Sequence, residues 1–227
     1  MDYRIIHDEQ ALREFIDWLP ELDENETYYL SVFARKKYCA ALIKSNDKTQ
    51  VKRFTSNKER MFDKIKQLEV PLGSLKLRDM DAPQESLVVY IHPNPRSNTK
   101  ACNKMLKHCA DLITNTARGY NLHAEAMSCI QKSKSRTCFV HFDIDTKDVN
   151  LSLINEVLPA KSYSIVETRG GYHLLVDTRA NLPKRNWFYE LEQLLKPEQT
   201  GDMMLPVPGT IQGEFIPKTL VYSEYTV

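Results

Sequence analysis

The sequence predicts an α+β fold in which a lobe spanning residues 1–130 packs against a second lobe spanning 131–227, with a cleft between them. Short runs of β-forming residues alternate with amphipathic segments along the whole chain. From 136 onward the order is strand, helix, strand, strand, helix. No internal repeat or low-complexity linker interrupts this order. It favours a sheet with helices packed on one face, in a split β-α-β arrangement.

Composition excludes several classes of protein. The chain has 227 residues, of which 42% are hydrophobic and 27% charged, as in ordinary globular proteins. No apolar run approaches the roughly 18 residues that a membrane-spanning helix needs, and the N-terminal MDYRIIHDEQ lacks the order of a secretory signal. Its five cysteines are irregularly spaced, without a C-x-x-C pair. We therefore expect a cytoplasmic protein with reduced thiols and no membrane partner.

The N-terminal lobe is expected to contain a small antiparallel sheet. Asp8 precedes ALREFIDWL and should cap a helix. Strands are expected at 27–34, 38–44 and 50–54, with the first two forming a hairpin, and again at 86–92. A further helix should begin at Ser56 or Asn57 and end near Leu68.

A longer helix is expected from Asn98 or Thr99 to about Ile113. Its apolar residues recur at helical spacing and would form one buried stripe. Cys102 and Cys109 lie on that stripe, so we interpret them as core residues rather than metal ligands.

Charge is unevenly distributed. The net charge is only +1, yet the segment 51–140 holds 16 Lys and Arg against 8 Asp and Glu. Such a segment could face an anionic polymer, or its lysines could simply be solvated on helix surfaces.

The stretch HFDIDTKD (141–148) carries acids on a strand rich in β-formers. Because side chains alternate across a strand, His141, Asp143 and Asp145 share one face while Val140, Phe142 and Ile144 share the other. Two neighbouring carboxylates repel unless a cation neutralises them, and oxygen ligands suit Mg²⁺ or Mn²⁺. The alternative is a strand end in which Asp145 caps the next helix and Asp143 is solvated.

A second signal follows in SIVETRGGYHLLV (164–176). Two apolar strands flank Gly170-Gly171, which predicts a tight hairpin with a positive φ. His173 follows within the second strand, with Tyr172, Leu174 and Val176 on the opposite side. It could reach a phosphate there, assisted by Arg169, or be a structural residue. Asp202, before the loop PVPGTIQG (206–213), is either a third cation ligand or a loop carboxylate.

Together, D-I-D on a strand, a Gly-Gly-Tyr-His hairpin and an acid before P-V-P-G-T-I-Q-G resemble the archaeo-eukaryotic primase (primase-polymerase) superfamily. The resemblance covers about 136–215 closely and the preceding region loosely, where HPNPRSNTKA (92–101) looks like the basic loop that such proteins place near the nucleotide. It implies an N-terminal α/β lobe, a basic segment in its second half, and an RRM-like catalytic lobe.

The resemblance also implies roles for individual residues. Asp143, Asp145 and Asp202 would be catalytic and bind the divalent ions, while His173 and Arg169 would contact the nucleotide's phosphates. Because Asp202 follows glycine rather than an apolar strand, Asp177 and Glu214 are substitutes for the third acid. Template contacts would come from Arg96, Lys100 and Lys104. The activity implied is DNA primase or polymerase activity: addition of NTPs or dNTPs on single-stranded DNA by two-metal phosphoryl transfer.

Two other functions remain open at this point. One is a catalytically inactive, primase-like module that binds nucleic acid in replication initiation. The other is a metal-dependent nuclease using the same acids. A helicase or another replication protein is a candidate partner, and a compact primase core without a zinc cluster favours a mobile-element origin.

Overall fold

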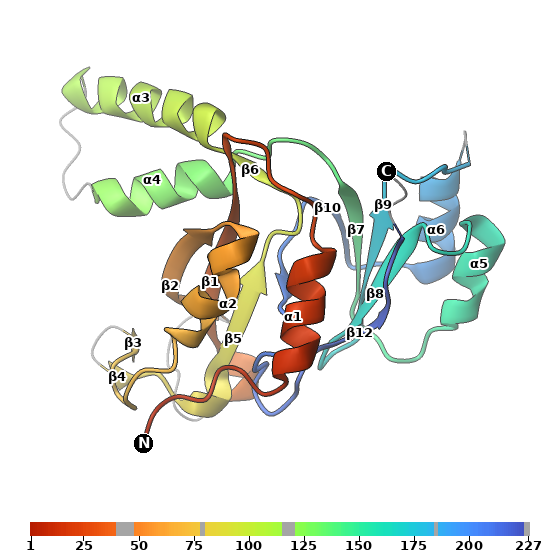
Figure 1. Cartoon of the computed structure of the whole chain (residues 1–227), viewed down its shortest axis with the longest axis horizontal. Helices are drawn as coiled ribbons and strands as arrows, with labels where there is room; N and C mark the ends of the chain where they lie inside the picture. The colour runs from red at the N-terminus through yellow and green to blue at the C-terminus, as the bar shows by residue number, and fades with distance from the viewer. Residues whose placement is uncertain (40–47, 78–79, 115–120, 184–185, 225–227) are drawn as a thin grey trace.

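The computed structural model describes the chain apart from residues 40–47, 78–79, 115–120, 184–185 and 225–227. It is a mixed α+β protein with antiparallel sheets, as the sequence predicts (Figure 1). The α-helices are α1 (Glu9–Trp18), α2 (Lys58–Lys66), α3 (Asn98–Thr114), α4 (Leu122–Gln131), α5 (Ile154–Val157) and α6 (Trp187–Leu195). Short 3-10 turns are η1 (Lys36–Tyr38), η2 (Gln84–Ser86) and η3 (Leu151–Leu153).

The first sheet has the strand order β11 (Leu205–Pro206), β5 (Leu87–Ile91), β1 (Glu26–Arg35), β2 (Lys48–Ser56), and β6 (Arg96–Ser97) also pairs with β1. All its pairings are antiparallel. Along β1, Tyr28, Leu30, Val32 and Ala34 join the core that α1 and α2 cover. Phe33 and Arg35 point to the opposite face, because side chains alternate along a strand.

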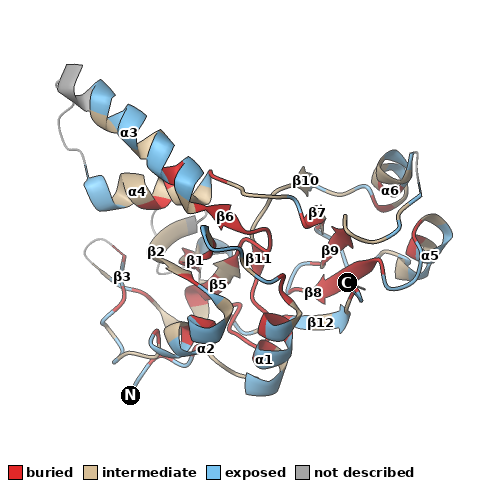
Figure 2. Cartoon of the chain, turned by 45° about the horizontal axis from the view of Figure 1, so that its top comes forward, coloured by how far each residue is buried: buried red, intermediate tan, exposed pale blue. Residues whose placement is uncertain are grey.

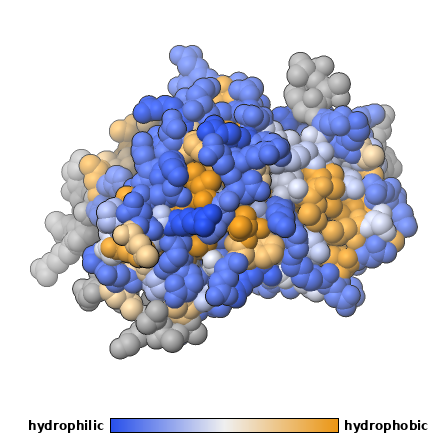
Figure 3. Space-filling model, turned by 60° about the horizontal axis from the view of Figure 1, so that its bottom comes forward, coloured by the Kyte–Doolittle hydropathy of each residue, from blue (hydrophilic) through white to orange (hydrophobic). Residues whose placement is uncertain are grey.

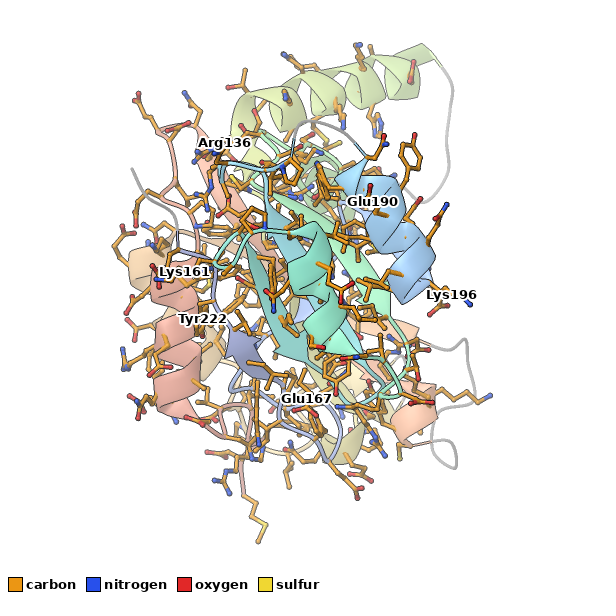
Figure 4. The ribbon with its side chains drawn as sticks, turned by 90° about the vertical axis from the view of Figure 1, so that its right-hand side faces the viewer. Arg136, Lys161, Glu167, Glu190, Lys196 and Tyr222 are labelled. Atoms are coloured by element: carbon orange, nitrogen blue, oxygen red, sulfur yellow. The ribbon has the colours of Figure 1, made fainter. Side chains whose placement is uncertain are left out.

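The second sheet has the order β10 (Gln199–Gly201), β7 (Phe139–Ile144), β9 (Tyr172–Asp177), β8 (Tyr163–Glu167), β12 (Lys218–Val221). β7 and β8 each pair antiparallel with β9, so they run parallel to one another with β9 between them. Because η3 and α5 connect β7 to β8, this is the expected split β-α-β arrangement. Viewed from the side, α5 and α6 lie over the outer face of this sheet (Figure 4). A separate two-stranded sheet pairs β3 (Lys76–Leu77) with β4 (Met80–Asp81).

One hydrophobic core spans both large sheets. It contains residues of α1, α2 and the first sheet together with Phe139, Val166 and Leu175 from the second. Trp18 of α1 stacks on Phe139 of β7 with ring centroids 4.8 Å apart. The buried strands therefore form a continuous region through the centre of the molecule (Figure 2). The segment after α6 also ties the sheets together, because β11 joins the first sheet while β10 and β12 join the second.

The first helix forms for the reason that the sequence indicates. The Asp8 side chain accepts a hydrogen bond from Ala11 N at the start of α1, and Leu12, Phe15 and Ile16 are its buried residues. Asn57 caps α2 in the same way. The face of the molecule that Figure 3 shows is mostly hydrophilic, with apolar side chains in separate areas.

The predicted hairpin at 27–34 and 38–44 is not formed as expected. After β1 the chain turns into η1, and the partner of β1 is β2, which contains the third predicted strand. Residues 40–44 lie outside the described part of the chain. The basic run Arg35-Lys36-Lys37 thus ends a strand and enters a 3-10 turn rather than connecting two strands of a hairpin.

The interpretation of Cys102 as a core residue is wrong. Helices α3 and α4 lie side by side and project from the sheets (Figure 1), so α3 has much less protein to pack against than its apolar stripe suggests. Cys102 is exposed, Cys109 is only partly buried, and Leu106 is 67% exposed.

Gly170 and Gly171 connect β8 and β9 as a hairpin, but neither has the predicted positive φ. Glycine is required here for space instead. A Cβ on Gly171 would lie 1.8 Å from the Ile144 carbonyl oxygen and 2.7 Å from Thr146 N. The hairpin therefore approaches the end of the acid-bearing strand more closely than any side chain allows.

We expect Gly171→Ala to lower the free energy of unfolding by about 2 kcal/mol or more, because the backbone of β7 must move to admit the methyl group. Urea denaturation measures this change. Gly170→Ala is the matched control, since its Cβ would meet only the Asp145 carboxylate, a side chain that can rotate away. Equal unfolding midpoints for the two variants would contradict the steric account.

Candidate functional site

A cavity of about 580 Å³ lies between the two sheets. Its walls come from the first sheet and η1 on one side, and from β7, β9 and the hairpin on the other. The residues lining it include Phe33, Arg35, Lys37, Tyr38, Tyr90, His92, Asp143, Asp145, Thr168, Gly170, His173, Glu198 and Gln212. This volume lies in the range of small-molecule sites.

The acids at 143 and 145 lie on the cavity side of β7, as alternation predicts. Phe142 and Ile144 are packed in the opposite direction, against α5 and α6. Burial raises the pKa of Asp143 to about 6, with further contributions from the negative charges of Asp145 and Glu198. The cavity therefore holds carboxylates that oppose one another's ionisation, an arrangement that a bound cation would relieve.

Glu198 is an acid of this wall that sequence reasoning missed. Its backbone N–H donates to the Asp143 carbonyl at 2.8 Å, which fixes it at the edge of β7. In the sequence, Glu198 is only an isolated acid in KPEQTGD, a few residues before Asp202. Its place beside Asp143 results from the pairing of β10 with β7, which the local sequence does not indicate.

His173 lies directly across from Asp143 in the β7–β9 register, and its Nδ1 is 3.5 Å from an Asp143 carboxylate oxygen. The same Nδ1 is 2.6 Å from His141 Nε2. Burial holds the pKa of His141 at about 4 and that of His173 well below its ordinary value. Both imidazoles are thus neutral near pH 7, and one proton lies between the two nitrogens.

A third imidazole faces the cavity from the end of β5. His92 is 6% exposed, and neither of its ring nitrogens has a hydrogen-bond partner among the residues that the structure describes. Burial and the nearby Arg96 charge lower its pKa to about 3. Two unpaired polar atoms at a cavity wall are expensive unless a ligand or water meets them.

Asp202 lies outside the lining of the cavity and is held by Arg96. The guanidinium donates from Nη1 at 2.7 Å and from Nη2 at 2.6 Å to the two carboxylate oxygens. Asn94 donates to the same carboxylate at 3.1 Å. Burial alone would raise the pKa of Asp202, but the hydrogen bonds and charge of Arg96 outweigh it and lower the pKa.

The other sequence-predicted residues are dispersed. Arg96 is 1% exposed and engaged with Asp202, so the structure does not bring it to the surface as a phosphate contact. Lys100 and Lys104 are on α3, where each donates to backbone carbonyls that follow α4. Arg169 is exposed on the hairpin, with its guanidinium 4.8 Å from the Tyr38 ring. Of the substitute acids, Asp177 pairs with Arg179, and Glu214 is exposed.

The donor chemistry of the acid wall fits a hard divalent cation. Asp143, Asp145 and Glu198 offer carboxylate oxygens, the ligands that Mg²⁺ and Mn²⁺ prefer. Within the described part of the chain, however, no three or more His, Cys, Asp or Glu side chains are arranged as they stand to hold a metal ion. Mg²⁺ is usually held by one or two carboxylates, with waters and substrate phosphates completing its coordination.

The chain was compared with protein-family models, with curated proteins and with solved structures, and nothing matched in any of the three. Among the described residues, no helix combines the length and apolar character needed to cross a membrane.

The raised pKa of Asp143 predicts a pH-dependent effect on stability without metal. The folded-state pKa of Asp143, about 6, is higher than the ordinary 3.8. The contribution of its protonated carboxyl group to the free energy of unfolding is therefore fully present below pH 3.8 and is lost as the pH rises through 6. In EDTA, Asp143→Asn should thus stabilise the protein at pH 8 by about 1–2 kcal/mol, after allowance for solvent screening. The gain should vanish near pH 4. Urea unfolding at both pH values measures it, and a pH-independent difference would contradict it.

The Arg96–Asp202 pair predicts a structural role for Asp202. Asp202→Asn leaves a buried guanidinium without its charge partner and should cost on the order of 3 kcal/mol of unfolding free energy at pH 7. Asp148→Asn, which alters an exposed carboxylate, is the control. If Asp202→Asn unfolds like the wild type, the pair does not support the fold.

Proposed function

We propose that the protein is a nucleotidyltransferase that adds nucleotides to a growing strand on a single-stranded DNA template. One observation carries the proposal: Asp143 and His173 face each other across adjacent strands, at the wall of a cavity that has carboxylates on one side and cationic side chains on the other. The order of D-I-D, Gly-Gly-Tyr-His and P-G-T along the chain supports it through the resemblance to primase-polymerases. The finer fold proposed, an RRM-like lobe within a primase-polymerase architecture, is consistent with the split β-α-β order.

In this proposal Asp143, Asp145 and Glu198 hold divalent cations, Mg²⁺ or Mn²⁺. Bound there, the cations would lower the pKa of an attacking hydroxyl and neutralise charge on the phosphates. Glu198 takes the place that the resemblance gives to Asp202, because Asp202 is committed to Arg96. In this proposal Asp202 does not bind a cation; its role is to fix the loop that follows β10.

His173 is suited to donate a hydrogen bond to a phosphate oxygen. Burial keeps its imidazole neutral, and the contacts of Nδ1 with His141 and Asp143 fix the orientation of the ring. A neutral donor adds no charge repulsion toward a cation beside it. Arg169, on the hairpin before His173, places its guanidinium over the ring of Tyr38, which lines the cavity.

The opposing wall suits a nucleotide. Phe33, Tyr38 and Tyr90 line it, and aromatic faces stack on nucleobases of any sequence. The basic character of 51–140 supports template binding, with Lys100 and Lys104 on the projecting α3 as the proposed phosphate contacts.

The test is incubation of the protein with a primed single-stranded DNA template, labelled NTPs or dNTPs, and Mg²⁺ or Mn²⁺, followed by sizing of the products. The wild type should elongate the strand. Asp143→Asn and Glu198→Gln should each lower the rate by about 100-fold or more. Mutation of a residue that only hydrogen-bonds to a metal ligand already costs about 10- to 100-fold, and loss of a ligand itself should cost at least as much. Asp148→Asn, outside the cavity, should retain the rate.

Two outcomes would overturn the proposal. A wild type that elongates nothing with either class of nucleotide is not a nucleotidyltransferase of this kind. A wild type that shortens DNA when nucleotides are omitted, in a manner abolished by Asp143→Asn, is a nuclease.

A further inference from the structure

The end of β1 brings two cationic side chains to the cavity. Arg35 is the last residue of β1, and Lys37 follows in η1. Both line the cavity, whereas Lys36, between them, does not. The chain thus presents adjacent lysines of similar exposure, of which only one faces the site.

These cations act on the acid wall across the cavity. The positive charges of Lys37 and Arg35 both lower the pKa of Asp143, against the effect of burial. The charge of Lys37 also reaches His173. Arg35 and Lys37 line the same cavity as Asp143, Asp145 and Glu198, so the two cations lie across one open cavity from the acid wall.

The cationic wall is held in place by contacts with both halves of the chain. Arg35 Nη1 donates to the Tyr90 hydroxyl at 2.8 Å, and burial raises the pKa of Tyr90, so the phenol stays neutral. Gln212 donates to the Tyr38 hydroxyl at 2.9 Å and accepts from Arg169 N at 2.8 Å. The 3-10 turn that carries Lys37 is thereby attached to the hairpin that precedes His173.

We propose that Arg35 and Lys37 form the subsite for the phosphate chain of a nucleoside triphosphate, a role that rests on the proposed nucleotidyl transfer. Carboxylates on one wall and cations on the other would place cation-bound phosphates between them. Lysine and arginine are the side chains that bind phosphate through charge-assisted hydrogen bonds. A cavity of about 580 Å³ accommodates a single small ligand, which favours the triphosphate over the backbone of a polymer.

The test is calorimetric titration with inorganic triphosphate in the presence of Mg²⁺, without any turnover. Lys37→Gln should weaken binding about tenfold or more, and Lys37→Arg should restore most of it. Lys36→Gln, the matched control, removes the same charge one residue away and should bind within about twofold of the wild type. A single-stranded oligonucleotide, titrated in parallel, should bind Lys37→Gln and wild type alike.

Each contrary result is informative. Equal loss of triphosphate binding in Lys36→Gln and Lys37→Gln would show a diffuse charge effect and overturn the subsite. So would a wild type that does not bind triphosphate, or a Lys37→Gln variant that loses only oligonucleotide binding. If the wild type binds triphosphate through Lys37 but never elongates DNA, the subsite stands and the proposed function fails. If the wild type elongates DNA while Lys37→Gln binds triphosphate normally, the proposed function stands and the subsite fails.

Discussion

The buried junction of Asn94, Arg96 and Asp202 is the constraint on which the arrangement of the cavity depends. The Asn94 amide oxygen accepts from Cys138 N and Phe139 N, and its nitrogen donates to the Phe139 carbonyl, so one side chain fixes the start of β7. Arg96 and Asp202 then bind the loop after β10 to the same point. A buried ion pair adds little net stability, but losing one partner is costly. The junction therefore specifies how the two sheets meet.

The junction fixes the start of β7, and β7 and β9 then determine where the side chains of the candidate site lie. β7 leaves the junction with its apolar side chains toward α5 and α6, and its polar ones toward the first sheet. β9 then sets His173 against Asp143, and Gly171 lets the hairpin close on the end of β7. The backbone thus holds the carboxylates of Asp143, Asp145 and Glu198 near one another although their negative charges repel. Burial, together with the negative charges of Asp145 and Glu198, raises the pKa of Asp143 at this position.

Features determined by local chemistry could be predicted from the sequence. The Asp8 cap, the alternation along β7 and the β8–β9 hairpin all follow from residues close together in the chain. Long-range features could not be predicted in this way. Arg96 and Asp202 are 106 positions apart, so nothing local distinguishes an acid that binds a cation from one that binds an arginine. The exposure of Cys102 and the space required at Gly171 likewise depend on what lies opposite, which periodicity does not encode.

The segment after α6 has a consequence for the order of assembly during translation. β10 and β12 are the two outer strands of one sheet, and β11 is an outer strand of the other. Neither sheet can therefore be completed until the last strands of the chain have been synthesised. On the ribosome, a nascent chain ending before β10 would hold β5, β7 and β8 with unpaired edges. Such intermediates invite pairing with other chains, so this topology links the yield of native protein to how quickly the final strands emerge and dock.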